Sequence, residues 1–233
     1  MTGRARTLKA AGFLLAGALV VTACGQGNGQ GQEQEHKPRV TAREQCDGAI
    51  SAAAAPALER ALGTETFRDT PTGWLDQAAA KLSEDYDKGV TVSLGAERCA
   101  VAANGPRHEL GVGFDVYQER SLGTYAGDPF MYPYDMGAEA EVGYRRAYLY
   151  VTCTSARLKG SDKRPARFMG ILRVRWASTP DTAATREDNL IILHSVTLAV
   201  VRKLGCVNDA GLPATPVIKP KKPTKVWPPG PVR

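Results

Sequence analysis

Side chains able to do chemistry are sparse in this sequence of 233 residues, which holds five cysteines and three histidines. The spacings that mark serine hydrolases, zinc peptidases and phosphate-binding loops do not occur in it. His36 lies in a Gly/Gln-rich stretch, His194 in an apolar stretch and His108 ahead of a strand-like run. Glu139 and Glu141 are close, but neighbouring acids are commoner on a solvated loop than in a catalytic cleft. We therefore expect no catalytic residues, no metal and no cofactor, with an uncharacterised hydrolase as the enzyme alternative.

Cys24 is the residue whose surroundings indicate a definite reaction. It follows an apolar run, residues 13–21, that is too short to span a bilayer and is preceded by the basic residues Arg4, Arg6 and Lys9. The segment Val21-Thr22-Ala23-Cys24 resembles the bacterial lipobox. This resemblance implies that residues 1–23 are a lipoprotein signal peptide, removed after the Cys24 thiol has received a diacylglycerol. Acyl chains of this kind, palmitate included, give stable membrane anchoring when two are present. The alternative is an ordinary secretory signal with a coincidental cysteine.

The other cysteines form an even set, which indicates disulfides in an oxidising compartment. They are Cys46, Cys99, Cys153 and Cys206. Four cysteines allow three connectivities, and the sequence alone does not choose among them. We favour Cys46–Cys99, which would join the start of the first helix to an early strand, and Cys153–Cys206, which would tie the end of the last helix to a central strand. Each bond would close a loop worth about 3–4 kcal/mol by chain-entropy estimates. A zinc site is disfavoured, since zinc ligands usually come in closely spaced pairs.

The net charge of +6 is concentrated at the two ends of the chain. Residues 1–23 carry +3 and residues 216–233 carry +5, whereas residues 40–215 hold 20 basic and 22 acidic side chains. A nucleic-acid-binding domain is usually basic over its folded part. This distribution therefore argues against a nucleic-acid partner.

The composition divides the chain into four parts. After the signal peptide, residues 24–39 form a Gly/Gln-rich stretch with almost no apolar side chains, which is typical of a flexible tether. Residues 40–213 have the apolar content of one folded domain. Residues 214–233 are rich in proline and lysine and are expected to form a disordered, extended tail.

Within the domain, three segments have helical periodicity. The first spans about residues 52–62 and ends at Gly63, and the second follows Thr72 as the expected N-cap. The third begins near Thr185, expected as its cap, and ends at Gly205 with basic residues in its last turn.

Strand-like patterns occupy the middle of the domain. Residues 110–116 alternate apolar and small or polar side chains, and residues 146–155 and 168–177 are rich in β-branched and aromatic residues. A weaker strand surrounds Cys99. The order of elements predicts an α+β fold: a mainly antiparallel sheet of about four or five strands, packed by two N-terminal helices and one long C-terminal helix.

Residues 117–134 form a segment unusually rich in aromatic residues, glycine and proline. Long loops of this composition often have a function or pack on themselves. Tyrosine offers contact area with a polar end, which suits a surface that binds a protein or a glycan. The candidate binding residues are Tyr117, Tyr125, Phe130, Tyr132 and Tyr134; the alternative is that their rings simply cover one end of the sheet.

Taken together, these features resemble actinobacterial secreted lipoproteins built on a small disulfide-containing domain of unknown function. The resemblance rests on the lipobox, the polar tether, Cys46 before an Ala-rich helix, Cys99 in an early strand, and Leu204-Gly205-Cys206 at the end of the last helix. It implies no catalytic residues. We expect a lipid-anchored protein on the extracytoplasmic face of the cell membrane, acting as a non-catalytic binding or structural module of the envelope. The alternative is a carrier of a small ligand or lipid, with an apolar cavity between the sheet and the last helix.

Overall fold

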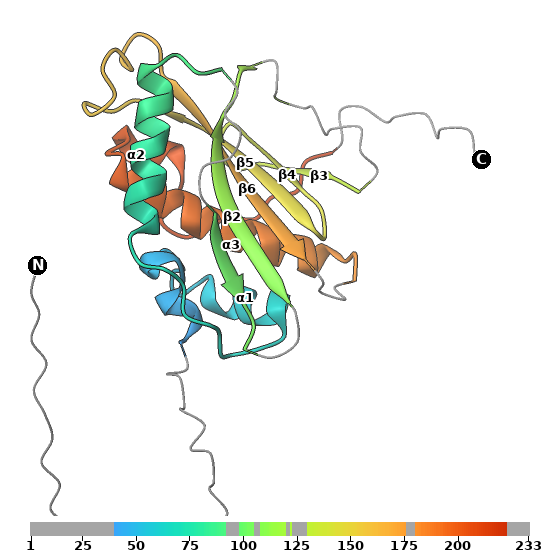
Figure 1. The fold of residues 1–233 in the computed structure, drawn as a ribbon. Helices are drawn as coiled ribbons and strands as arrows, with labels where there is room; N and C mark the ends of the chain where they lie inside the picture. The colour runs from blue at the N-terminus through green and yellow to red at the C-terminus, as the bar shows by residue number, and fades with distance from the viewer. Residues whose placement is uncertain are drawn as a thin grey trace, which may run out of the picture. The chain divides into compact units, whose positions relative to one another are not determined.

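The computed structural model describes residues 40–91, 98–104, 108–119, 122, 130–175 and 180–222. The expectations for the signal peptide, Cys24, the tether and Tyr125 fall on residues outside these ranges. The described part is an antiparallel sheet with three α-helices packed on one of its faces (Figure 1). The α+β prediction is therefore confirmed.

The sheet has six strands, in the order β1-β2-β6-β5-β4-β3. Four of them match predicted strands: β1 (Cys99–Ala102), β2 (Glu109–Val116), β5 (Arg146–Cys153) and β6 (Ala166–Arg175). The two strands that complete the sheet are β3 (Tyr132–Tyr134) and β4 (Glu139–Val142). These two were not predicted, because β3 lies at the end of the aromatic segment, which was expected to form a loop, and β4 contains two glutamates, a residue type depleted in strands.

The helices are α1 (Ala55–Leu62), α2 (Trp74–Asp87) and α3 (Ala183–Lys203). α1 ends as predicted at Gly63, whose φ of 64° is the left-handed conformation that glycine adopts without a steric penalty.

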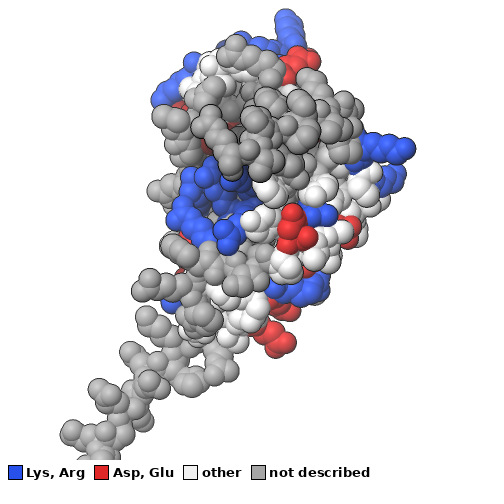
Figure 2. All heavy atoms as spheres, turned by 90° about the vertical axis from the view of Figure 1, so that its right-hand side faces the viewer, with Lys and Arg blue, Asp and Glu red and all other residues white. Residues whose placement is uncertain are grey.

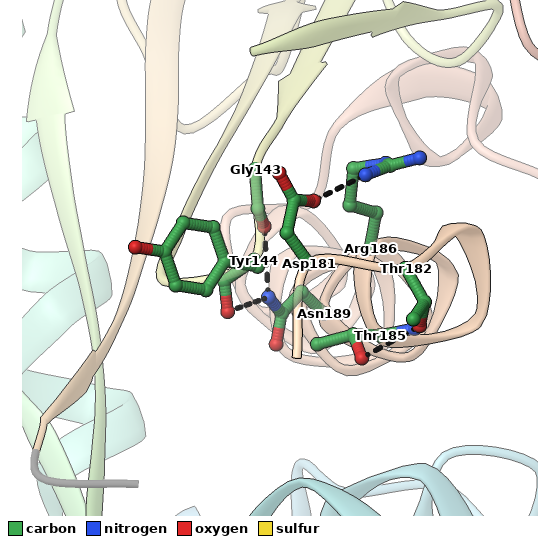
Figure 3. Close-up of polar contacts among 7 residues, drawn as sticks. All are labelled: Gly143, Tyr144, Asp181, Thr182, Thr185, Arg186 and Asn189. Carbon is green, nitrogen blue, oxygen red and sulfur yellow. Dashed lines mark hydrogen bonds and ion pairs between the residues drawn. The ribbon is translucent and has the colours of Figure 1, made fainter. Parts of the chain in front are cut away.

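The N-caps of the other two helices differ from the prediction. α2 has Gly73, not Thr72, as its N-cap, and the Asp47 carboxylate accepts from the backbone N–H groups of Gly73 and Leu75 at 2.9 and 2.7 Å. α3 is capped by Thr182, whose Oγ1 accepts from the Thr185 N–H at 3.2 Å (Figure 3). The capping carboxylate of α2 thus comes from a distant part of the chain, which a local pattern does not reveal.

α3 is buried on several sides because it lies between the sheet and α1. A Cβ atom added at Gly170 of β6 would lie 2.8 Å from Thr197 Oγ1 and 3.0 Å from Leu193 Cδ1, so helix and sheet are in close contact there. On the other side, Ser195 Oγ accepts from Ser51 N and donates to Ala49 O, both at 2.8 Å. None of the described helices is long and apolar enough to cross a membrane.

Both favoured disulfides are present, and they attach the ends of the fold to the sheet. Cys46–Cys99 joins the 3₁₀ segment before α1 to β1, with the Cα atoms 5.6 Å apart. Cys153–Cys206 joins the end of β5 to the segment that follows α3, with the Cα atoms 5.2 Å apart. Such bonds persist in oxidising compartments, which supports an extracytoplasmic location for this domain.

Part of the segment predicted as a tail pairs with the sheet edge. Asp135 N donates to Lys219 O and Lys221 N donates to Pro133 O, both at 2.8 Å, so the chain runs beside β3. The prediction put the start of the disordered tail at residue 214, whereas these hydrogen bonds hold residues 219–221 on the domain. Residues 223–233 lie outside the described part of the chain.

Candidate functional site

The face of the sheet opposite α3, here called the open face, has a small apolar cluster of its own. Alternate residues of β6 separate the two faces: Phe168 and Leu172 belong to the main core, whereas Met169 and Ile171 pack on the second cluster. That cluster is formed by Tyr117, Met131, Tyr148 and Tyr150. The rings of Tyr117 and Tyr150 meet edge to face with their centroids 5.0 Å apart. The middle of the open face is therefore covered by two residues of the aromatic segment, Tyr117 and Met131, and two of β5, Tyr148 and Tyr150.

Beyond this cluster, arginines predominate on the open face, with Glu109 of β2 opposite Arg175 of β6. Arg146 of β5 lies directly opposite Arg173 of β6, and both side chains are exposed. Arg98, just before β1, reaches over the same end of the sheet, because its Cδ would lie 3.8 Å from a Cβ atom at Gly111. Figure 2, seen from the side away from α2, shows basic side chains gathered in a hollow. Only the pairing of β5 with β6 brings Arg173 beside Arg146.

Gly111 of β2 lies between Arg98 and Arg173, and Arg146 lies beyond Arg173 on β5. These four residues are here called the basic hollow, with Gly111 as its floor. On β2, Gly111 pairs with Arg173 on one side and with Ala100 on the other. Apart from Arg98, the nearest heavy atom to an added Cβ would be Cys99 O at 4.0 Å. The hollow thus has a backbone floor and guanidinium walls.

A buried side chain of α3 sets the position of the β4–β5 turn that leads into Arg146. Asn189 Nδ2 donates to Gly143 O at 2.9 Å and to Tyr144 O at 3.1 Å (Figure 3). The turn closes on itself where Gly143 N donates to Arg146 O at 2.8 Å. The core helix therefore fixes the backbone from which one wall of the basic hollow projects.

The described candidate aromatic residues separate into buried and exposed rings. Tyr117 and Tyr134 are only 7% and 3% exposed, and their rings belong to the two apolar clusters. Phe130 and Tyr132 are 59% and 36% exposed. Tyr125 lies outside the described residues. The aromatic surface available to a partner therefore narrows, among described residues, to Phe130 and Tyr132.

Arg186 of α3 holds the second of these rings in place. Its guanidinium lies over the Tyr132 ring at 3.8 Å from the centroid and forms an ion pair with Asp181. The Arg186 guanidinium also donates a hydrogen bond to the Tyr134 hydroxyl. Burial raises the pKa of Tyr134, and the nearby guanidinium opposes this increase. Since the Arg186 side chain is itself 13% exposed, Tyr132 is held by a well-packed cation.

The two described histidines are bound to backbone carbonyl groups. His108 Nδ1 lies 3.2 Å from Leu62 O, and His194 Nε2 lies 2.9 Å from Pro213 O. Burial lowers the pKa of His194, and its hydrogen bond to Pro213 partly opposes the shift. Each ring thus has a structural contact.

Two of the acidic residues are likewise engaged in local contacts. Glu119 pairs with Arg167 at 3.0 Å, and buried Glu141 accepts from the Tyr150 hydroxyl at 3.4 Å. Across the described ranges, no group of three or more His, Cys, Asp and Glu side chains has the arrangement of a metal site.

Two pockets are lined by described residues, one at the ends of inner strands and one beside the edge strand β1. One, of about 170 Å³, lies between the end of α2 and the adjoining ends of β2 and β6. The other, of about 180 Å³, lies beside the Cys46–Cys99 bond, with Trp74 and Arg98 among its walls. Ligand pockets usually measure about 300–1,000 Å³. Neither pocket is lined by α3, where an apolar carrier cavity was expected.

These features define a small α+β domain with two disulfides, an exposed aromatic pair and a basic hollow. Comparison of the chain with protein-family models, with curated proteins and with solved structures gave no match.

Proposed function

We propose that this chain is a lipid-anchored, extracytoplasmic binding module of the cell envelope, without catalytic activity of its own. Anchoring is assigned to a diacylglyceryl group on Cys24, as the resemblance to actinobacterial secreted lipoproteins implies. The two disulfides support export, because they need an oxidising compartment. The partner we propose is another envelope protein, and a glycan is the competing outcome of the test.

The observation that carries the binding role is the exposed pair Phe130 and Tyr132. Large rings that stay exposed while their position is fixed are typical of interface hot spots, because little side-chain freedom is lost on binding. Arg186 provides that fixation for Tyr132 through its position over the ring. Phe130 precedes β3 and is the most exposed large apolar side chain among the described residues.

The absence of a cleft among the described functional groups favours binding over catalysis. The histidines His108 and His194 contact backbone carbonyls in separate parts of the domain, and neither lines the two pockets described above. General acid–base catalysis needs a titratable group within hydrogen-bond reach of a bound substrate. A surface-binding role requires only the exposed rings and the rigid sheet below them.

The binding role is tested by replacing both rings with alanine and measuring capture of envelope proteins by the membrane-anchored chain. We expect the Phe130→Ala, Tyr132→Ala variant to lose a specific partner while its melting temperature falls by no more than about 3 °C. The matched control is Val207→Ala, Val217→Ala, whose side chains are 58% and 52% exposed. Undiminished capture by the ring variant would refute the aromatic surface, and retention on purified cell-wall glycan alone would replace the protein partner with a glycan.

The anchor is tested separately. Cys24→Ser should abolish labelling by radioactive palmitate and leave residues 1–23 attached, whereas the wild-type chain should carry the label and lose these residues. A wild-type chain that takes up no label would contradict lipid anchoring without affecting the binding surface.

A further inference from the structure

We propose that the basic hollow on the open face binds a phosphate group. This site includes neither ring of the exposed aromatic pair, although the Phe130 backbone lies beside the β4–β5 turn before Arg146, and it does not depend on the partner proposed above. Its walls are Arg98, Arg146 and Arg173, and its floor is the backbone at Gly111.

The choice of cation points to this ligand. All three walls are arginines, whose planar guanidinium groups donate two parallel hydrogen bonds to phosphate or carboxylate oxygens. Arg98 lies on one side of the floor, and Arg173 lies on the other with Arg146 beyond it, so a ligand would be approached from two sides. A tetrahedral phosphate offers oxygens in several directions and can accept from all three, whereas a planar carboxylate presents its two oxygens on one side.

Without a bound anion, the neighbouring arginines lower the stability of the folded domain. Like charges placed directly opposite on neighbouring strands repel each other, and Arg146 and Arg173 are such a pair. Within the described ranges, the ion pairs that form do not include Arg98, Arg146 or Arg173. A bound anion would offset the repulsion.

The glycine at position 111 independently supports a ligand site in the basic hollow. It lies inside β2, where a glycine weakens a strand and often marks close approach of a ligand or a backbone. The pairing of β2 with both neighbours runs without interruption past Gly111, so no bulge requires it. An added Cβ would meet only ordinary contacts, at 3.8 Å or more, so packing does not require it either. The missing side chain leaves room for a ligand above the backbone.

Phosphate could reach the hollow as a soluble ion or as part of a phospholipid headgroup. The two sources differ in chemistry, because the first is a free phosphate and the second a phosphodiester. An NMR titration of the full chain in neutral detergent, following the Nε–H signals of the arginines, can compare inorganic phosphate with glycerophosphoglycerol, the headgroup of phosphatidylglycerol.

We expect saturable shifts of the Arg98, Arg146 and Arg173 signals. The probe that binds with the higher affinity identifies whether the ligand is a free phosphate or a phospholipid headgroup. Arg146→Gln, Arg173→Gln should weaken binding at least about tenfold. The matched control is Lys159→Gln, Lys163→Gln, which removes the same charge from exposed sites at the other end of the β5–β6 hairpin. This control should change the affinity by no more than about twofold. Gly111→Val should also weaken binding, because it fills the floor while favouring the strand.

Three results would overturn the proposal. The first is that neither probe produces saturable shifts. The second is that the two double variants weaken binding equally, which would indicate unspecific charge attraction. The third is that glutarate, a carboxylate of similar size, binds as tightly as either phosphate probe. A folded Gly111→Val variant with unchanged affinity would remove the floor from the site and count against the assigned geometry.

Discussion

Arg146 and Arg173 lie directly opposite each other on two central strands of the sheet, β5 and β6. Repulsion between such charges is a direct cost to the sheet, and it is relieved when one of them is made neutral. The pair therefore links two properties that are measured separately, the stability of the free domain and its affinity for an anion.

Arg146→Thr should stabilise the free domain by about 0.5 kcal/mol, because it removes this repulsion and places a β-branched residue in a strand. The gain corresponds to a melting temperature about 1–2 °C higher, and it should shrink as salt screens the charges. The control is Arg167→Thr on the same face of β6, which removes an exposed ion pair with Glu119 and should gain nothing from lower salt. A variant that is less stable than wild type at low salt would contradict the repulsion.

Removing one disulfide should weaken the fold substantially. Cys153→Ser, Cys206→Ser opens a loop with a sequence separation of 53 residues. The chain-entropy model assigns such a loop about 4 kcal/mol, or about 10 °C in melting temperature. Because Cys46–Cys99 has the same separation, the model predicts an equal loss for that bond. Denaturant unfolding measures both variants, and a loss below about 1 kcal/mol for either bond would contradict this account.

Asn189→Ala should destabilise the domain by about 2 kcal/mol, because the carbonyl groups of Gly143 and Tyr144 lose their buried donor. It should also weaken phosphate binding, since the turn before Arg146 is released. Asn189→Asp tests the hydrogen bonds independently of side-chain volume, because it keeps the volume and replaces the amide donor with a carboxylate acceptor. We expect a larger loss for Asp than for Ala in denaturant unfolding, and the reverse order would indicate that the packing of the side chain matters most.

His194 should make the domain less stable in mild acid. Its pKa is lowered in the folded state, mainly by burial, so the unfolded chain binds a proton more readily. The contribution of His194 is therefore full above its ordinary pKa of 6.5 and is lost progressively as the pH falls from there toward the lowered, folded value. His194→Gln removes the titration and retains a side chain able to donate a hydrogen bond. Unfolding free energies at neutral pH and in mild acid should differ less in the variant than in wild type; equal differences would exclude His194 as the cause.

Much of the fold follows from local patterns in the sequence. The predicted end of the first helix at Gly63 was confirmed. The sequence reveals this end because the residue that terminates a helix in the left-handed conformation is most often glycine. The cap of α3 was misplaced by three residues, since Thr182 and Thr185 offer the same hydroxyl and only the backbone geometry distinguishes them.

Site features that depend on the order of the strands could not be predicted from the sequence. Tyr132 and Tyr134 belong to one three-residue strand and have the same side chain, yet one is exposed and the other is buried beside α3. Likewise, Arg146 and Arg173 are distant in the chain and become neighbours only because β5 pairs with β6 in this register. Pairing between distant strands depends on the whole sheet.

The central claim is that this domain binds an envelope protein through its exposed rings, and site-specific photo-cross-linking in intact cells tests it most directly. A photoreactive phenylalanine analogue at Phe130 should give one discrete cross-linked product containing a second protein. The same analogue at Val207, which is equally exposed, should give none. Absence of a product at Phe130, or the same product at both positions, would contradict a binding surface at the aromatic pair.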